Sequence, residues 1–391
     1  MPLAPAEKKM WETPPETDPK KKSDDEINAK YEKRERRILT EMNREKLPSF
    51  VNALKKPGYI ELRPFFQRRN RWDKKMQSRL IESFMLNIPV PPIILYEKEY
   101  NSYELIDGEQ RITAIQDFYE NKLELTDLEL WSELEGYTYN QLPLNIKAAL
   151  ARRSLSSIVL ITESASDPEE ALLLKQIVFE RLNTRGVDLS RQEVRSCLYY
   201  GKFNQLLFEL SQNHIFTKAW GIPIGDNEAI WRNRLYTTME DVELVLRFFA
   251  LRHSHKMDEN LQDFLDKYMI KSRRFYDKDI ASLRDTFLRT ISIAHQIYGD
   301  NLFNPKPYEP KNITFKNQPY KTYYEAVMVG FSNHLDSEDV LIARKYQVIE
   351  ATKKLLQEDK DRLLTGGGKT KADIQKRLEL FDDMLNQVIN E

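Results

Sequence analysis

The sequence predicts an α+β domain followed by an all-α region. Between residues 59 and 162, short runs of apolar and β-branched residues alternate with amphipathic helical segments. From Pro168 onward only helical periodicity remains. The length of 391 residues also favours two to three domains of ordinary size over one.

Composition shifts divide the chain into three parts. Residues 1–26 are rich in proline and in charge of both signs, which predicts a disordered tail. Residues 27–165 form the predicted α+β domain, beginning with an exposed helix over 27–47. Residues 166–391 form the predicted helical domain.

The α+β domain is predicted from six further elements. Asp73 is a suitable N-cap for a helix that ends near Leu86, and Gly108 separates a strand from a helix. In chain order we expect a strand at 59–62, a helix at 73–86, strands at 91–96 and 103–106, a helix after Gly108, and a strand at 155–161. In the second half we expect helices at 168–182, 190–200, 203–212, 227–251, 261–270, 280–298, 322–334, 338–357 and 370–389.

The composition excludes several classes of protein. The 60 basic and 61 acidic residues nearly cancel, so the chain as a whole is not a basic nucleic-acid coat, although a local basic patch is compatible with this balance. A single cysteine excludes an intrachain disulfide and, with five scattered histidines, argues against a structural zinc site. No apolar run has the length of a membrane span, and the first residues lack the apolar core of a signal peptide. We therefore expect a cytoplasmic protein with no membrane partner.

The most informative segment is YELIDGEQRIT at residues 103–113. A helix that starts directly after a strand and a glycine aims backbone N–H groups outward, and such groups suit a phosphate. Gly108 permits close approach of the backbone, Arg111 can contact phosphate oxygens with two N–H groups, and Asp107 can hold a divalent cation. A plain turn with a surface ion pair between Arg111 and Asp107 or Glu109 explains the same residues equally well.

This segment, YELIDGEQRITAI, resembles the Asp-Gly-Gln-Gln-Arg signature of the DUF262 family, the N-terminal domain of GmrSD-type modification-dependent restriction systems. The resemblance extends backward through RRNRWDKKMQSRLIESFMLNIPVPPIILYE and forward through VFERLNTRGVDLSRQEVRSCLYYGKF, and covers roughly residues 59–208. It implies a ParB/sulfiredoxin-like fold for the α+β domain. ELIDGEQR is also similar to the nucleotide-contacting Gly-Glu-Arg-Arg segment of ParB proteins.

The resemblance implies nucleotide binding and hydrolysis at residues 107–111. Asp107, Gln110 and Arg111 are the candidate catalytic residues, and Asp107 is the candidate ligand of Mg²⁺. Gly108, Glu109 and Arg111 are candidate nucleotide-binding residues through their backbone amides and the Arg111 guanidinium. Glu109 stands where the signature has glutamine, which adds a negative charge near the phosphates but is favourable at the start of a helix.

Three arginines lie among aromatic residues just before the helix at 73–86. Arginines in this setting suit phosphates and exposed bases, so Arg68 and Arg69 are candidate nucleic-acid contacts. The resemblance implies that Arg71 helps to bind the nucleotide. The alternative is a solvated loop, and for Phe65 and Trp72 we favour burial in the core.

The segment at residues 179–190 reads as a helix end followed by a capped helix. Ser190 and Glu193 form the pattern of a capping box, which needs no ligand to explain it. The resemblance makes Asn183 a candidate nucleotide-binding residue and adds Glu193 as a further possibility. Cys197 lies on an apolar helix face and is interpreted as a core thiol.

Two further sequence features argue against other enzymes. TGGGKT at residues 365–370 is similar to a P-loop, but the first glycine is missing and DKDRLL before it is too charged for a buried strand. The histidines lie outside the contexts typical of the HNH nuclease domain that full-length GmrSD-like proteins carry; they are His214, His253, His255, His295 and His334. We interpret the C-terminal half as a sensor or partner-docking region.

The leading hypothesis is a nucleoside triphosphate-hydrolysing subunit of a prokaryotic anti-phage or restriction system, with Mg²⁺ as cofactor. Its partners would be a nucleoside triphosphate, DNA, and a separate nuclease or other defence subunit. The alternative is a nucleotide-dependent switch that does not hydrolyse its ligand. A third hypothesis, from another class, is a nuclease with an unrecognised active site.

Overall fold

The computed structural model describes residues 3–12, 40–61, 72–161, 190–199, 201–225, 228–308, 315–366 and 368–391, and the single positions 28 and 178. The chain divides into two compact units. Thr17–Asp188 forms one, here named the α+β unit, and Met1–Glu16 with Leu189–Glu391 forms the other, here named the helical unit. The boundary predicted near residue 165 lies earlier in the chain than the boundary between these units.

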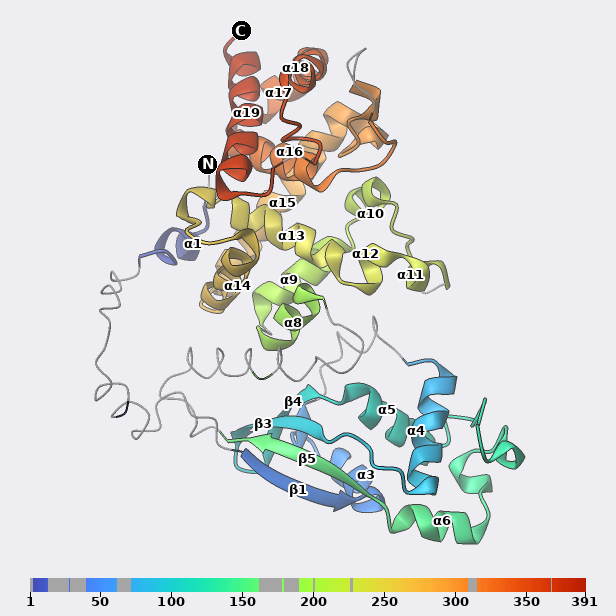
Figure 1. Ribbon diagram of the computed structural model, residues 1–391. Coiled ribbons are helices and arrows are strands. Elements are labelled where there is room, and N and C mark those ends of the chain that lie inside the picture. The colour runs from blue at the N-terminus through green and yellow to red at the C-terminus, as the bar shows by residue number, and fades with distance from the viewer. Residues whose placement is uncertain are drawn as a thin grey trace. The chain divides into compact units, whose positions relative to one another are not determined.

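Within the described residues, the α+β unit contains a five-stranded mixed sheet in the order β1-β5-β3-β4-β2 (Figure 1). β1 is antiparallel to β5 and β3 is antiparallel to β4, whereas β5–β3 and β4–β2 are parallel pairs. The β3–β4 hairpin places Asp107, at the end of β4, opposite Ile94 near the start of β3. The strands are β1 Thr40–Lys46, β2 Ile60–Glu61, β3 Ile93–Glu99, β4 Ser102–Asp107 and β5 Ser154–Leu160.

Helices cover one face of this sheet and bury its apolar side chains. The helices are α3 Leu47–Leu54, α4 Lys74–Leu86, α5 Glu109–Tyr119 and α6 Leu144–Ala151, with short 3₁₀ turns at Ser132–Leu134 and Tyr139–Gln141. The sheet contributes Ile93, Leu95, Leu105, Leu155 and Val159 to the core. These residues alternate along their strands, as the two-residue period of a strand requires.

The cap predicted for α4 is present. The Asp73 carboxylate accepts a hydrogen bond from the Met76 N–H at 2.8 Å. Further along α4, the carboxylate of Glu82 accepts the backbone N–H groups of the three consecutive residues 129–131, at 2.8–3.0 Å. Burial raises the pKa of Glu82, but these three donors and the nearby Arg79 outweigh it and lower the pKa. Glu82 therefore fixes the long loop after α5 against α4.

The segment Thr40–Lys46 is a strand, whereas the sequence predicts a helix over residues 27–47, so that prediction is wrong for its last part. Its Glu, Met, Arg and Lys residues favour a helix, but β1 pairs with β5 along its whole length and this pairing overrides local propensity. β1 is an edge strand whose side chains are mostly exposed, and its charges oppose pairing with another chain. Apart from position 28, residues 27–39 lie outside the described residues.

The helical unit has no strand among its described residues. Its helices are α8 Arg191–Leu198, α9 Lys202–Ser211, α10 His214–Trp220, α11 Glu228–Arg232, α12 Arg234–Thr237, α13 Glu240–Leu251, α14 Leu261–Ser272, α15 Asp277–Tyr298, α16 Lys321–Asn333, α17 Glu338–Ala343, α18 Lys345–Glu358 and α19 Lys371–Asn390. The helix expected over 227–251 is divided into α11, α12 and α13, and Met239 just before α13 has a left-handed φ of 54°. Apart from position 178, the helix expected at 168–182 lies outside the described residues.

Residues 3–12 belong to the helical unit and contain the short helix α1, Pro5–Lys9. The prediction of a disordered tail over residues 1–26 is therefore wrong for this segment. Glu7 is completely buried against Arg252, which follows α13, and against Tyr268 of α14, which lie 245 and 261 residues later in the chain. Such a contact leaves no signal in local composition.

The predicted fold class, an α+β domain followed by an all-α region, is confirmed. In the part of the chain that the structure describes, every helix is too short or too polar to cross a membrane.

Candidate functional site

The strand–glycine–helix motif has the geometry that its sequence predicts. β4 ends at Asp107, Gly108 has φ of 110°, and α5 starts at Glu109. A Cβ atom at position 108 would collide with the side chain of Ile93, with a distance of 2.9 Å to its Cβ. Gly108 is therefore required both by its backbone angle and by its contact with β3.

Arg111 lies one turn into α5 and reaches back to the end of β4. Its Nη2 donates to Asp107 Oδ2 at 2.7 Å and to the backbone carbonyl of Pro92 at 3.3 Å. The side chain of Arg111 is 15% exposed and that of Asp107 is 37% exposed. The ion pair expected from the plain-turn alternative is thus present, and it also holds the guanidinium at the start of the helix.

The backbone of α5 adds donors at the same place. The first intrahelical hydrogen bond runs from the Ile112 N–H to the Gly108 carbonyl at 3.0 Å. The N–H groups of Glu109, Gln110 and Arg111 precede it and have no carbonyl partner within the helix. Together with the helix dipole they favour an anion at this position.

The side chain of Gln110 has a structural contact that the sequence did not predict. Its Oε1 accepts the backbone N–H of Trp72 at 2.9 Å. Trp72 directly follows the arginine segment in the sequence, and this hydrogen bond fixes the backbone of Trp72 at the start of α5. A role for Gln110 in positioning a water or a cation stays a prediction.

Four of the predicted site residues lie outside the described residues; they are Arg68, Arg69, Arg71 and Asn183. Glu193 is described and acts as a helix cap. Its carboxylate accepts the Ser190 N–H at 2.6 Å, and its own N–H donates to Ser190 Oγ at 3.2 Å. The capping box is confirmed and accounts for Glu193 without a ligand.

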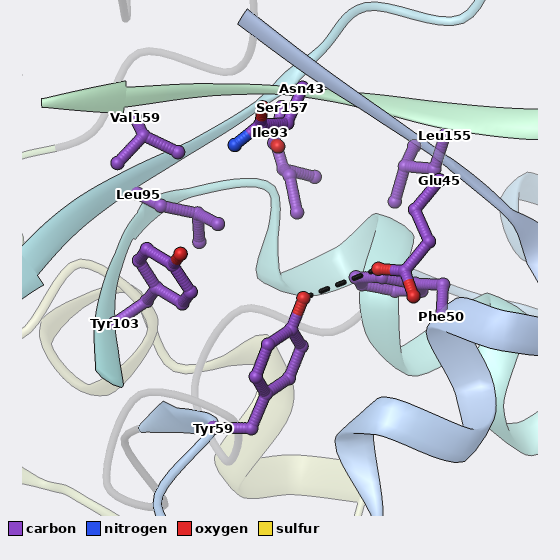
Figure 2. A pocket seen from close by; sticks show the side chains of 10 residues that line it. All are labelled: Asn43, Glu45, Phe50, Tyr59, Ile93, Leu95, Tyr103, Leu155, Ser157 and Val159. Carbon is purple, nitrogen blue, oxygen red and sulfur yellow. Dashed lines mark hydrogen bonds between the residues drawn. The ribbon is translucent and has the colours of Figure 1, made fainter. Parts of the chain in front are cut away.

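A small cavity lies between the covered face of the sheet and α3 (Figure 2). Its volume of about 40 Å³ has room for roughly three water molecules, which is far too little for a nucleotide. Its lining residues with polar side-chain groups are Asn43, Glu45, Tyr59, Tyr103 and Ser157, and its lining residue Ile93 also contacts Gly108. This cavity could not be predicted from the sequence, because the residues of β1 favour a helix.

Two tyrosines and one carboxylate form the polar side of this cavity. The Tyr59 hydroxyl donates to Glu45 Oε2 at 3.2 Å, as the dashed line in Figure 2 shows. The rings of Tyr59 and Tyr103 meet edge to face with centroids 5.7 Å apart. Burial, together with the charge of Glu45, raises the pKa of Tyr59 to about 12. Tyr59 therefore stays neutral at physiological pH and serves as a donor.

The histidines and the P-loop-like segment make structural contacts in the described part of the chain. No three His, Cys, Asp or Glu side chains there gather as a metal site would require. His253 contacts Glu7, and His334 contacts Asp382. The P-loop-like segment follows helix α18 rather than a strand, and Thr370 caps α19. Because a P-loop follows a strand, the helix before this segment supports the interpretation that it is not a P-loop.

The fold and the site together define an α+β domain with an arginine at an anion-favouring helix start. Residues 49–200 match the family model described as GmrSD restriction endonuclease, N-terminal domain. The chain therefore carries a GmrSD N-terminal domain of the DUF262 family, and this domain indicates a protein of a restriction system. Searches of the curated proteins and of the solved structures found no match.

Proposed function

We propose that residues 107–111 bind the phosphates of a nucleoside triphosphate and that the protein hydrolyses it. The observation that carries the proposal is the placement of Arg111 beside the N–H groups that open α5, directly after the close turn at Gly108. A guanidinium and several backbone N–H groups at one helix start form a strong phosphate-binding arrangement.

The residues at this point fit a Mg²⁺ ion that is held mainly by its nucleotide. Mg²⁺ in such sites commonly takes one or two protein carboxylates, with phosphate oxygens and water as its other ligands. Asp107 offers one partly exposed carboxylate. A bound Mg²⁺ would neutralise phosphate charge, while Arg111 and the backbone of α5 hold the phosphates in place.

Hydrolysis would require little covalent chemistry from the protein. The oxygen of a water forms a bond to the γ-phosphorus while the bond to the β–γ bridging oxygen breaks, which yields a nucleoside diphosphate and inorganic phosphate. Positioning and charge neutralisation supply most of the catalysis in such reactions. Asp107 would orient the water, and Arg111 would stabilise the charge on the transferred group.

A nucleotide-dependent switch without hydrolysis is the second candidate, and one observation favours it. Asp107 Oδ2 already accepts from Arg111, and Gln110 Oε1 already accepts from Trp72. Both candidate positioning groups are thus engaged in structural contacts. In this case nucleotide occupancy alone would control the engagement of a partner.

We further propose that nucleotide binding or turnover controls engagement of DNA or of a separate nuclease. The restriction-system family of the domain supports DNA and nuclease-type partners in general. Arg68 and Arg69 are proposed to contact DNA, Arg71 and Asn183 to contact the nucleotide, and the helical unit to receive the partner. Incubation with plain and modified DNA tests the third hypothesis, a nuclease.

The first test is phosphate release from ATP, GTP, CTP and UTP with Mg²⁺, with and without DNA. We expect Arg111→Ala to lower turnover at least about 100-fold, because a preorganised donor to the transferred group contributes about this much. Arg152→Ala is the matched control, since Arg152 is an exposed arginine of the same unit. Thermal unfolding of each variant shows whether the fold is intact.

The outcomes separate the two candidates. Turnover that is lost in Arg111→Ala and kept in Arg152→Ala supports hydrolysis and identifies the preferred base. Tight nucleotide binding without turnover, lost in Arg111→Ala, supports the switch. If folded wild-type protein shows neither binding nor turnover, the motif is structural and both candidates are wrong.

A further inference from the structure

The N-terminal segment, which contains α1, packs on the helical unit (Figure 1). Ala4 at the N-cap and Glu7 in the first turn of α1 lie three residues apart on the same side of the helix, and Trp11 follows the helix end. Ala4 and Glu7 are buried, whereas Lys8 and Lys9 are exposed. The segment thus has a binding face and a solvent face.

Glu7 is the central contact of this binding face. The Tyr268 hydroxyl donates to Glu7 Oε1 at 2.9 Å, and His253 Nε2 lies 3.1 Å from the same oxygen. Arg252 Nη1 donates to the carboxylate at 3.3 and 3.4 Å, and the Ala4 N–H donates to Oε2 at 3.0 Å. Each carboxylate oxygen therefore has at least two partners.

Contacts on either side of Glu7 complete the groove. The Trp11 ring stacks on Phe264 with centroids 5.4 Å apart and an interplanar angle of 12°, and the Lys271 ammonium lies 5.7 Å from its centroid. The Ala6 N–H donates to the buried carboxylate of Asp279 at 3.0 Å. The groove is thus formed by the end of α13, by α14 and by the start of α15.

The chemistry of the groove makes it specific for a carboxylate on the docked segment. A fully buried carboxylate is unfavourable unless charged and hydrogen-bonded partners replace its water. Burial raises the pKa of Glu7, but Arg252 and His253 outweigh it and hold the pKa below its usual range. Without this carboxylate, Arg252 and His253 would lose their buried acceptor.

The docked segment also has the character of a separate ligand. α1 has five residues, which is too short to be stable as an isolated helix in water, so its structure depends on the groove. In the chain it precedes the α+β unit, whereas the groove follows that unit. The chain segments before and after the α+β unit therefore both belong to the helical unit.

We propose that the groove lined by Arg252, His253, Phe264, Tyr268 and Asp279 is a peptide-binding site whose ligand is the chain's own residues 3–12. The bound segment acts as a clasp that holds the N-terminal end of the chain on the helical unit. Its recognition elements are the carboxylate at position 7 and the indole at position 11. This inference does not depend on the proposed nucleotide chemistry.

The test uses the full chain with a protease cleavage site inserted after Lys22. After cleavage, we expect the N-terminal fragment to stay with the rest of the protein in size-exclusion chromatography, as identified by mass spectrometry. Glu7→Ala should release the fragment. Glu12→Ala, which removes an exposed carboxylate from the same segment, should retain it. Release of the fragment from the cleaved chain with Glu7 in place, or retention by Glu7→Ala, would overturn the proposal.

Hydrogen exchange in the uncut chain supplies a second measurement. We expect Tyr268→Phe, which keeps the ring and removes only the hydroxyl donor to Glu7, to raise the exchange rates of residues 5–10 at least about tenfold. Thermal unfolding in the same samples separates loss of the clasp from loss of the helical fold. If the protection of residues 5–10 from hydrogen exchange does not depend on protein concentration, the ligand is the chain's own segment. Protection that falls on dilution would assign the ligand to a second copy and contradict the clasp.

Discussion

At the residue scale, Gly108 determines whether the candidate site can form. Its φ of 110° is rarely adopted by residues with a side chain, and Ile93 occupies the space that a Cβ would need. Gly136 in the same unit also has a positive φ, of 79°, but a Cβ added there would have no neighbouring atom within 4 Å. The two glycines therefore share the backbone requirement and differ in the steric one.

We expect Gly108→Ala to destabilise the α+β unit by more than the about 1–3 kcal/mol of backbone strain alone, and to weaken nucleotide binding. Gly136→Ala should show only the strain and leave binding unchanged. Chemical unfolding and nucleotide titration of both variants check this. Equal stability losses in the two variants would mean that Ile93 moves aside and that the contact with β3 is unimportant.

At the scale of the elements, Tyr59 connects the start of β2 to β1. Its hydroxyl donates to Glu45 on β1, and its carbonyl accepts the N–H of Tyr103 on β4 at 2.9 Å. Tyr59 thus links three strands that do not all neighbour each other in the sheet. The link depends on the proton of the Tyr59 hydroxyl, because a phenolate would face the carboxylate of Glu45.

This dependence predicts a loss of stability in alkali. The pKa of Tyr59 is raised from its ordinary value of 10 to about 12, so its contribution is fully present below pH 10 and is lost as the pH rises toward 12. The Tyr59→Phe variant should therefore lose less stability than the wild type as the pH rises from 10 to 12. Tyr103, whose pKa is also raised, is present in both proteins and contributes equally. Unfolding midpoints at several pH values from about 8 to 12 measure the difference. Parallel pH profiles for the two proteins would show that the Tyr59 proton is not linked to folding.

At the scale of the whole molecule, the family match crosses the boundary between the two units. The match runs to residue 200, but α8, near its end, belongs to the helical unit. Arg195 of α8 is only 1% exposed and donates to Asp266 at 2.5 Å and to Glu243 at 3.0 Å. This buried ion pair network fixes the end of the GmrSD N-terminal domain inside the helical unit.

We expect Arg195→Met to cost about 3–5 kcal/mol of stability in the helical unit, because it removes a buried cation that Asp266 and Glu243 share, and of these two carboxylates Glu243 still pairs with Arg247. Arg191→Met is the control, since Arg191 forms an exposed pair with Asp263 on the same helix as Asp266 and should cost at most about 1 kcal/mol. Chemical unfolding of both variants decides the matter. A cost below that of the control would show that apolar packing by methionine compensates for the lost network.

Local features of the fold and site could be predicted from the sequence. The cap at Asp73, the turn at Gly108 and the capping box at Ser190 depend on residues within a few positions of each other, and all three are confirmed. The family was predicted from motifs in the correct order over roughly residues 59–208, and the match over residues 49–200 confirms it. Roles in nucleotide binding and hydrolysis stay predictions, because they depend on a ligand.

The fold class, the order of most elements and the family could thus be predicted from the sequence, because periodicity, caps and motifs are properties of neighbouring residues. The tertiary structure alone decided that Thr40–Lys46 is a strand, that Gln110 binds the Trp72 backbone, and that Glu7 is buried in the helical unit. Each of these depends on a partner far away in the chain. A strand needs its neighbour and a buried charge needs its counter-charges, and neither requirement can be read from the segment itself.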